Sequence, residues 1–178
     1  MNLSYLLTGG VRSGKSSYAL NLAVEAKRPF YIATGWSGDK EMQKRIAKHQ
    51  QERDDGWITI EEQFDIGSAV KEAVGRRADF ILVDCLGAWI TNLLVQEVNT
   101  DITVDKNVLS FVKILEKKIP VPLAIVSNEV GMGLVPDNKM GRSFRDSLGF
   151  VNQRIANVVD KVIFMVSGLP IVVKGEVI

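Results

Sequence analysis

The 178-residue chain carries 22 basic and 21 acidic side chains, so its formal net charge at pH 7 is only +1. This near-neutral balance gives no general attraction to nucleic acid or to an anionic membrane, so any anion must bind locally. With 46% hydrophobic and 24% charged residues, the composition is that of an ordinary globular protein. The length predicts a single domain over residues 1–178 with a full hydrophobic core.

The chain has one cysteine and no long apolar stretch near its start. Cys85 lies in an apolar run, so we interpret it as a small buried residue rather than a reactive thiol. The first apolar stretch has no basic region before it and is too short for a signal peptide or a membrane span. We therefore expect a cytoplasmic protein without stable membrane insertion.

Apolar runs alternate with helical patterns along the chain, as in strand–helix–strand units. We interpret five runs as buried strands: residues 3–7, 30–33, 80–83, 123–126 and 162–166. Two further runs are expected to form another strand and part of a C-terminal edge hairpin: residues 57–60 and 171–173. This order predicts an α/β fold with a mainly parallel sheet and helices on both faces. Such sheets bind ligands at the carboxyl ends of their strands.

The first strand leads directly into the phosphate-binding pattern G-x-x-x-x-G-K-[ST] at residues 9–16. In such a loop the backbone N–H groups surround phosphate oxygens, Lys15 reaches the outer phosphates and the Ser16 hydroxyl ligates Mg²⁺. A helical pattern over residues 16–26 follows, and its positive N-terminal end would point at the same phosphates. The predicted nucleotide contacts here are Gly9, Gly10, Val11, Arg12, Ser13, Gly14, Lys15 and Ser16.

The helical pattern after the 30–33 strand carries the only histidine of the chain, His49. Met42 and Ile46 lie on the same stripe, so one interpretation is a half-buried structural histidine. Lys48 and Arg45 lie beside it, and these cations would attract an anionic ligand and favour the neutral, nucleophilic imidazole. Pattern and composition leave both interpretations open.

A second element of a phosphate-transfer site is expected where the 80–83 strand ends in Asp84. A carboxylate at this position holds Mg²⁺ through water or positions the nucleophile. Strand ends are commonly polar, but the pairing with the phosphate loop favours the functional interpretation. The predicted metal ligands are therefore Ser16 and Asp84.

The loop after the 123–126 strand, residues 127–133, contains Glu129 between polar and glycine residues. Glu129 is interpreted either as a general base or metal partner, or as a carboxylate that caps a local backbone group. In the helical stretch that follows, Arg142 and Arg145 lie three residues apart. They either clamp a phosphate, act across a subunit boundary like an arginine finger, or are solvated surface residues, which we favour.

Several segments together resemble the adenosylcobinamide kinase / adenosylcobinamide-phosphate guanylyltransferase family. They are residues 8–16, 31–34, 41–49, 91–94, 128–133 and 151–154. The phosphate loop is shared by many enzymes, whereas the histidine helix and the Asn-Glu-Val-Gly-Met-Gly loop are much more specific. The resemblance covers nearly the whole chain and implies a RecA-like P-loop NTPase fold. It also implies a homo-oligomer, which we expect to be a trimer.

The same resemblance implies two activities in the nucleotide-loop branch of cobalamin assembly. One phosphorylates the aminopropanol hydroxyl of adenosylcobinamide with ATP or GTP, and the other transfers GMP from GTP to adenosylcobinamide phosphate. By its place in the matching helix, His49 is similar to the residue that is guanylylated in this family. Histidine suits that role because a pKa of about 6.5 leaves a neutral nucleophile near physiological pH.

The resemblance also implies nucleotide contacts beyond the phosphate loop: Thr34, Gly35, Trp36, Gln50, Gln51, Glu52, Arg53, Glu61 and Asp84. The chain departs from some relatives at Lys48, where they have a second histidine, at residues 50–53, and at Asp84, where they have glutamate. Two alternatives remain. One is a kinase alone with a structural His49, and the other is a RecA-like motor or nucleotide switch, which the near-zero charge disfavours.

Overall fold

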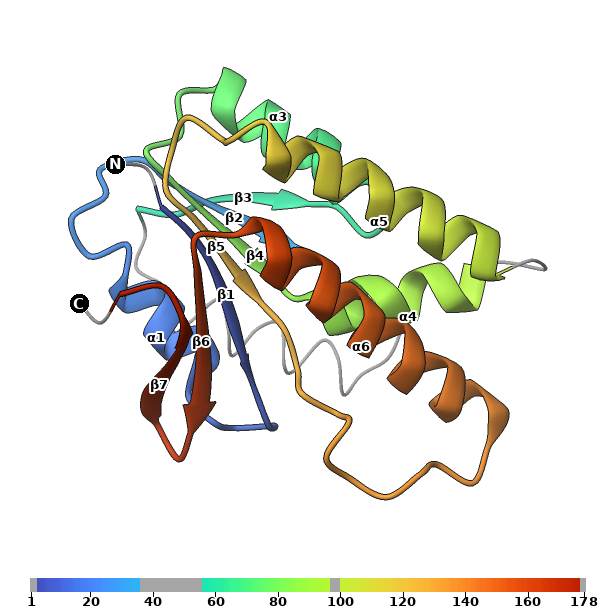
Figure 1. Cartoon of the computed structure of the whole chain (residues 1–178). Helices are drawn as coiled ribbons and strands as arrows, with labels where there is room; N and C mark the ends of the chain where they lie inside the picture. The colour runs from blue at the N-terminus through green and yellow to red at the C-terminus, as the bar shows by residue number, and fades with distance from the viewer. Residues whose placement is uncertain (1–2, 36–55, 97–99, 177–178) are drawn as a thin grey trace.

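The structure is a computed structural model that describes residues 3–35, 56–96 and 100–176. Its strands form one sheet in the order β3-β2-β4-β5-β1-β6-β7 (Figure 1). The strands are β1 (Ser4–Gly9), β2 (Pro29–Ala33), β3 (Ile58–Glu61), β4 (Phe80–Asp84), β5 (Leu123–Val126), β6 (Lys161–Val166) and β7 (Leu169–Lys174). All neighbouring pairs are parallel except β6 and β7, which form an antiparallel hairpin. The predicted sheet and its edge hairpin are confirmed.

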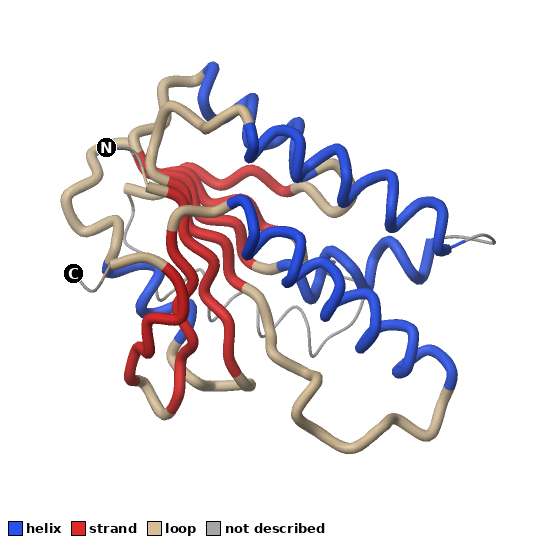
Figure 2. The backbone as a smooth tube through the Cα atoms, in the orientation of Figure 1, coloured by secondary structure: helices blue, strands red, loops and turns tan. Residues whose placement is uncertain are grey.

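Helices cover both faces of this sheet, as predicted (Figures 1 and 2). One face is covered by α1 (Lys15–Asn21). The other is covered by α3 (Ile66–Gly75), α4 (Leu86–Gln96), α5 (Thr100–Glu116) and α6 (Lys139–Val158). Neighbouring strand residues alternate between the two layers. On β1, Leu6 packs in the core cluster beneath the four helices and Leu7 packs in the cluster beneath α1. No helix in the described ranges is long and apolar enough to cross a lipid bilayer.

Helix α1 is shorter than the predicted 16–26 segment. Beyond it, the chain makes tight turns, with Ala26 N donating to Ala23 O at 2.9 Å. The Asp79 carboxylate then accepts the backbone N–H groups of Lys27 and Arg28 at 2.7 and 3.0 Å. These bonds draw the chain out of helical geometry and into β2, which begins at Pro29.

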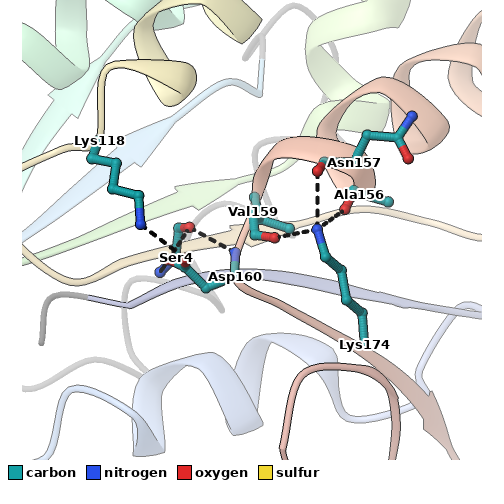
Figure 3. Close-up of polar contacts among 7 residues, drawn as sticks. All are labelled: Ser4, Lys118, Ala156, Asn157, Val159, Asp160 and Lys174. Carbon is teal, nitrogen blue, oxygen red and sulfur yellow. Dashed lines mark hydrogen bonds and ion pairs between the residues drawn. The ribbon is translucent and has the colours of Figure 1, made fainter.

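A polar cluster fastens β1 to β6 at the end of the sheet opposite the phosphate loop (Figure 3). Asp160 Oδ2 accepts from Ser4 N at 2.9 Å and from Ser4 Oγ at 2.7 Å, and Ser4 Oγ accepts from Asp160 N at 3.0 Å. The hydrogen bond from the Ser4 backbone N–H is the main cause that lowers the pKa of Asp160. Lys118 adds an exposed ion pair at 3.8 Å. This cluster fixes where the two strands begin.

Lys174, on β7, fastens the hairpin to the end of α6 (Figure 3). Its ammonium donates to the carbonyls of Ala156, Asn157 and Val159 at 2.8, 3.0 and 2.6 Å. Carbonyls at a helix C-terminus lack partners within the helix, so a cation there is favourable.

Candidate active site

The strand registers bring Glu61 and Asp84, two of the predicted site residues that the structure describes, to one edge of the sheet. In adjacent strands Glu61 is level with Ala33, and Ala33 with Asp84. Asp84 is level with Val126 on β5, which lies next to β1. The phosphate loop after β1 and the carboxylate at the end of β4 therefore face the same side, with only β5 between them.

Two glycines of the phosphate loop are required by close backbone neighbours. Gly9 has a φ of 146°, and a Cβ there would clash with the carbonyl oxygen of Met165 on β6. Gly14 has a φ of 93°, and its Cβ would lie 3.1 Å from Gly168 Cα in the β6–β7 turn. The same turn donates a hydrogen bond from Gly168 N to Ser13 O at 3.0 Å. The hairpin thus supports the loop from outside, while Gly10, Val11 and Arg12 are exposed at its tip.

The Lys15 ammonium lies inside the loop. Its Nζ donates to Gly10 O at 2.6 Å and to Gly9 O at 3.0 Å, and the residue is only 7% exposed. Burial lowers the pKa of Lys15, and its electrostatic interactions with Cys85 and with the Asp84 carboxylate act in the opposite direction. The loop therefore holds its cation on its own carbonyl groups, at the place where phosphate oxygens are expected.

Asp84 joins the phosphate loop to the centre of the sheet. Its Oδ2 accepts from Ser16 Oγ at 3.0 Å and from the Tyr31 hydroxyl at 3.1 Å. Asp84 and Ser16 supply hard oxygen atoms, which are the ligands that Mg²⁺ prefers. Within the described ranges no group of three or more His, Cys, Asp or Glu is arranged to hold a metal ion. A cation at Ser16 and Asp84 would therefore take its other ligands from water and phosphate, as Mg²⁺ commonly does.

Cys85, which follows Asp84, is not a reactive thiol. Burial, followed by the negative charge of Asp84, raises the pKa of its thiol to about 11, so the sulfur stays protonated at neutral pH. The residue as a whole is partly exposed. The interpretation of Cys85 as a structural residue agrees with this environment.

The side chain of Thr34 points into the protein rather than toward the open edge of the sheet. The residue is fully buried, and its Oγ1 donates to Cys85 O and accepts from Cys85 N, both at 2.7 Å. Its carbonyl accepts from Asn92 Nδ2 at 2.7 Å. Thr34 thus ties the ends of β2 and β4 together.

The other predicted contacts divide into two groups. Gly35 is partly exposed after β2, and Glu61 is exposed at the end of β3, so both lie at the same open edge as Asp84. The rest lie outside the described residues: Trp36, His49, Gln50, Gln51, Glu52 and Arg53.

The loop between β5 and α6 is fastened to the phosphate loop and to α6. Glu129 N donates to Gly9 O at 3.0 Å, and the Glu129 carboxylate accepts from Gly131 N at 2.6 Å. The local capping interpretation of Glu129 is the one that the structure shows. On the α6 side, Asn152 Oδ1 accepts from the buried Ser127 hydroxyl at 2.6 Å, and Asn152 Nδ2 donates to Asn128 O at 3.1 Å.

The two arginines of α6 hold the same loop by its backbone. Arg142 donates to Pro136 O and Asp137 O at 3.1 and 2.8 Å. Arg145 donates to Gly133 O and Gly131 O at 3.3 and 3.2 Å. Arg142 is exposed and Arg145 is partly exposed, so the favoured interpretation of both as surface residues agrees with the structure. The structure adds that each guanidinium donates to loop carbonyls.

Three contributions to the site were not predicted from the sequence: the Tyr31 hydroxyl on Asp84, the Asn152 amide behind the β5 end, and the Gly168 N–H on the phosphate loop. Tyr31 and Asn152 both lie in segments that carried the family resemblance, and this was the available signal. Nothing in the local sequence pointed to the backbone contact of Gly168.

Comparison with known proteins gives results that agree with the geometry. Residues 5–173 match the family model described as cobinamide kinase / cobinamide phosphate guanyltransferase. The chain is 39% identical to the bifunctional adenosylcobalamin biosynthesis protein CobP of Pseudomonas aeruginosa, over 96% of this chain and 97% of the relative. It is 36% identical to the bifunctional adenosylcobalamin biosynthesis protein CobU of Salmonella typhimurium, over 95% and 98% of the two chains.

The fold also has a counterpart among solved structures. An ATPase from the type III secretion system of pathogenic bacteria superposes with a TM-score of 0.58 at 11% identity, over 92% of this chain and 52% of that one. At this identity the likeness concerns the fold alone. It is the fold of a phosphate-loop ATPase, as the sequence predicts.

Proposed function

Since the chain belongs to the cobinamide kinase / cobinamide phosphate guanyltransferase family, we propose how its own residues divide the family's two reactions. The protein is a bifunctional enzyme of cobalamin biosynthesis that acts in assembly of the nucleotide loop. It is a kinase for cobinamide and a guanylyltransferase for cobinamide phosphate. We take adenosylcobinamide and adenosylcobinamide phosphate as the acceptors, and ATP or GTP as the donors.

The observation that carries the kinase step is the 3.0 Å approach of Ser16 Oγ to Asp84 Oδ2 beside the phosphate loop. Ser16 and Asp84 would hold Mg²⁺, which supplies positive charge to the donor's phosphate oxygens when bound. Lys15 leaves the carbonyls of Gly9 and Gly10 and pairs with the outer phosphates. The aminopropanol hydroxyl then forms the new bond to the γ-phosphorus and loses its proton, and the bond to the nucleoside diphosphate breaks.

We assign guanylyl transfer to His49, supported by the likeness of its helix to the family. Its neutral imidazole nitrogen attacks the α-phosphorus of GTP, and the bond to pyrophosphate breaks. A phosphate oxygen of adenosylcobinamide phosphate then attacks the same phosphorus and releases the histidine, giving adenosylcobinamide-GDP. Nucleotide contacts are proposed for Glu61, Gly35 and Trp36, and for residues 50–53.

Labelling with GTP that carries ³²P at the α-phosphate tests this assignment. The protein should acquire an acid-labile, alkali-stable label, as a phosphorus–nitrogen bond requires, and His49→Ala should acquire none. Phosphorylation of adenosylcobinamide by His49→Ala should continue, because the phosphate loop is intact. A wild-type protein that phosphorylates adenosylcobinamide but never acquires the label would refute the covalent route.

We also propose a cytoplasmic homo-oligomer and expect a trimer. The edge strand β7 supports self-association, since its Leu169, Ile171 and Val173 side chains are 68, 52 and 65% exposed along one strand. Exposed apolar edge strands commonly lie in subunit contacts. Sedimentation of wild-type protein and of a variant with these three residues changed to threonine measures this directly.

A further inference from the structure

The loop between β5 and α6 exposes an unusual set of large apolar side chains. Met132, Leu134 and Val135 are 81, 97 and 69% exposed, and we call these three residues the apolar loop surface. Figure 1 shows that the loop projects past the sheet at the end where β1 leads into the phosphate loop. Contiguous apolar side chains in water are unfavourable, so such a surface points to a binding partner.

The loop that carries this surface is held in one shape. Arg145 and Arg142 bind four of its carbonyl groups, and the Glu129 carboxylate accepts the Gly131 N–H. Asn138 closes its far end by accepting from Gly141 N at 2.7 Å at the start of α6. The apolar side chains therefore project from a fixed frame, which lowers the entropy lost when a partner binds.

The frame is also continuous with the nucleotide site. Glu129 N donates to Gly9 O at 3.0 Å, and Gly9 is the first residue of the phosphate loop. The apolar loop surface thus begins three residues after a direct contact with that loop. The frame therefore joins the apolar loop surface to the edge of the sheet that carries the phosphate loop.

We propose that the apolar loop surface binds the corrin macrocycle of the acceptor, and this inference rests on the proposed function. The macrocycle is too large to enter a phosphate loop, and only its aminopropanol arm has to reach the transferred phosphate. Broad, largely apolar ring faces match flexible thioether and aliphatic side chains. Arg142 and Arg145 already donate to loop carbonyls, so their charges are engaged within the loop. The apolar loop surface therefore suits an apolar ring better than the charged phosphates of a second nucleotide. For contact with a second copy of the chain, the exposed apolar side chains of β7 offer a separate surface, so self-association does not require the apolar loop surface.

The test compares a triple variant, M132S, L134S and V135S, with a matched control, V24S and L109S. Val24 and Leu109 are 83 and 41% exposed and lie after α1 and on α5, away from the loop. Corrinoids absorb visible light, so equilibrium dialysis measures binding of adenosylcobinamide without nucleotide. We expect at least about a tenfold weaker affinity and a similar rise in KM for adenosylcobinamide in the triple variant, since about 1.4 kcal/mol corresponds to tenfold.

The affinity of the triple variant for a fluorescent GTP analogue and its ³²P labelling by GTP should equal those of wild type, because the phosphate loop is unchanged. Unchanged adenosylcobinamide affinity in the triple variant would overturn the proposal while leaving the proposed function intact. Loss of self-association in sedimentation together with weaker binding would also overturn it, because the surface would then be a subunit contact. Wild-type protein that neither binds nor phosphorylates adenosylcobinamide would instead refute the proposed function.

Discussion

Ser16 Oγ donates to Asp84 Oδ2 at 3.0 Å, although 68 residues separate the two in the chain. The contact spans the distance from the first turn of α1 to the end of β4, across the intervening strand β5. It shows that the phosphate loop and the predicted metal-site carboxylate form one site.

Asp84→Asn should lower the kinase turnover number by about a hundredfold, because a neutral amide gives Mg²⁺ much less charge compensation than a carboxylate. The matched control is Asp79→Asn, at the other end of the same apolar run, whose carboxylate accepts from the backbone N–H groups of residues 27 and 28. Steady-state phosphorylation of adenosylcobinamide measures both. Equal turnover in the two variants would contradict a metal-binding role for Asp84.

Tyr31→Phe should weaken metal binding about tenfold, in the range found when a hydrogen bond to a metal ligand is removed. The phenol donates to Asp84 Oδ2 at 3.1 Å and so fixes the orientation of that carboxylate. Titration of Mn²⁺ with electron paramagnetic resonance, in the presence of GDP, measures affinity independently of turnover. Tyr5→Phe, a buried tyrosine on β1, is the control and should bind Mn²⁺ like wild type.

Gly9→Ala should destabilise the protein by about 2–4 kcal/mol and abolish nucleotide binding, since it combines a left-handed backbone with a clash. The clash is with the carbonyl oxygen of Met165, which cannot move without disturbing β6. Gly149→Ala in α6 meets no atom within 4 Å and should instead stabilise by about 0.5–1 kcal/mol through helix propensity. Chemical unfolding measures both, and a neutral Gly9→Ala would show that the loop adapts.

Asp160→Asn should destabilise the protein by about 1 kcal/mol at pH 7, because two hydrogen bonds from Ser4 lose a charged acceptor. The pKa of Asp160 is lowered in the folded state, so its stabilisation is present above the unfolded pKa of 3.8. It is lost as the pH falls through the lower folded value. The difference in unfolding free energy between wild type and variant should therefore shrink below about pH 4. A difference that is constant down to pH 2.5 would assign the effect to shape rather than charge.

The strands and the phosphate loop could be predicted from the sequence because their structure depends on burial and on local backbone geometry. The β4 run is buried on both faces, so its apolar residues mark the strand and Asp84 marks its end. The phosphate loop could be predicted as well, because its turn has positive φ values at Gly9 and Gly14, which favour glycine and leave a motif in the sequence.

Contacts between residues that are distant in the chain could not be predicted from the sequence. The Tyr31 ring packs in the core beneath α1, and only its hydroxyl reaches Asp84, so the residue has the pattern of an ordinary strand tyrosine. Arg142 and Arg145 bind carbonyl groups of a loop, and backbone carbonyls leave no mark on residue type. Thr34 looked available because it follows a strand, whereas its hydroxyl turns inward to Cys85.

The hydrogen bond from Gly168 to Ser13 has a consequence for the order in which the protein matures on the ribosome. Ser13 is synthesised early, while its partner turn lies beyond β6. A nascent chain that has already made the strand and helix on either side of the phosphate loop still lacks this outer support. The nucleotide site therefore reaches its final form only after translation has passed the β6–β7 turn.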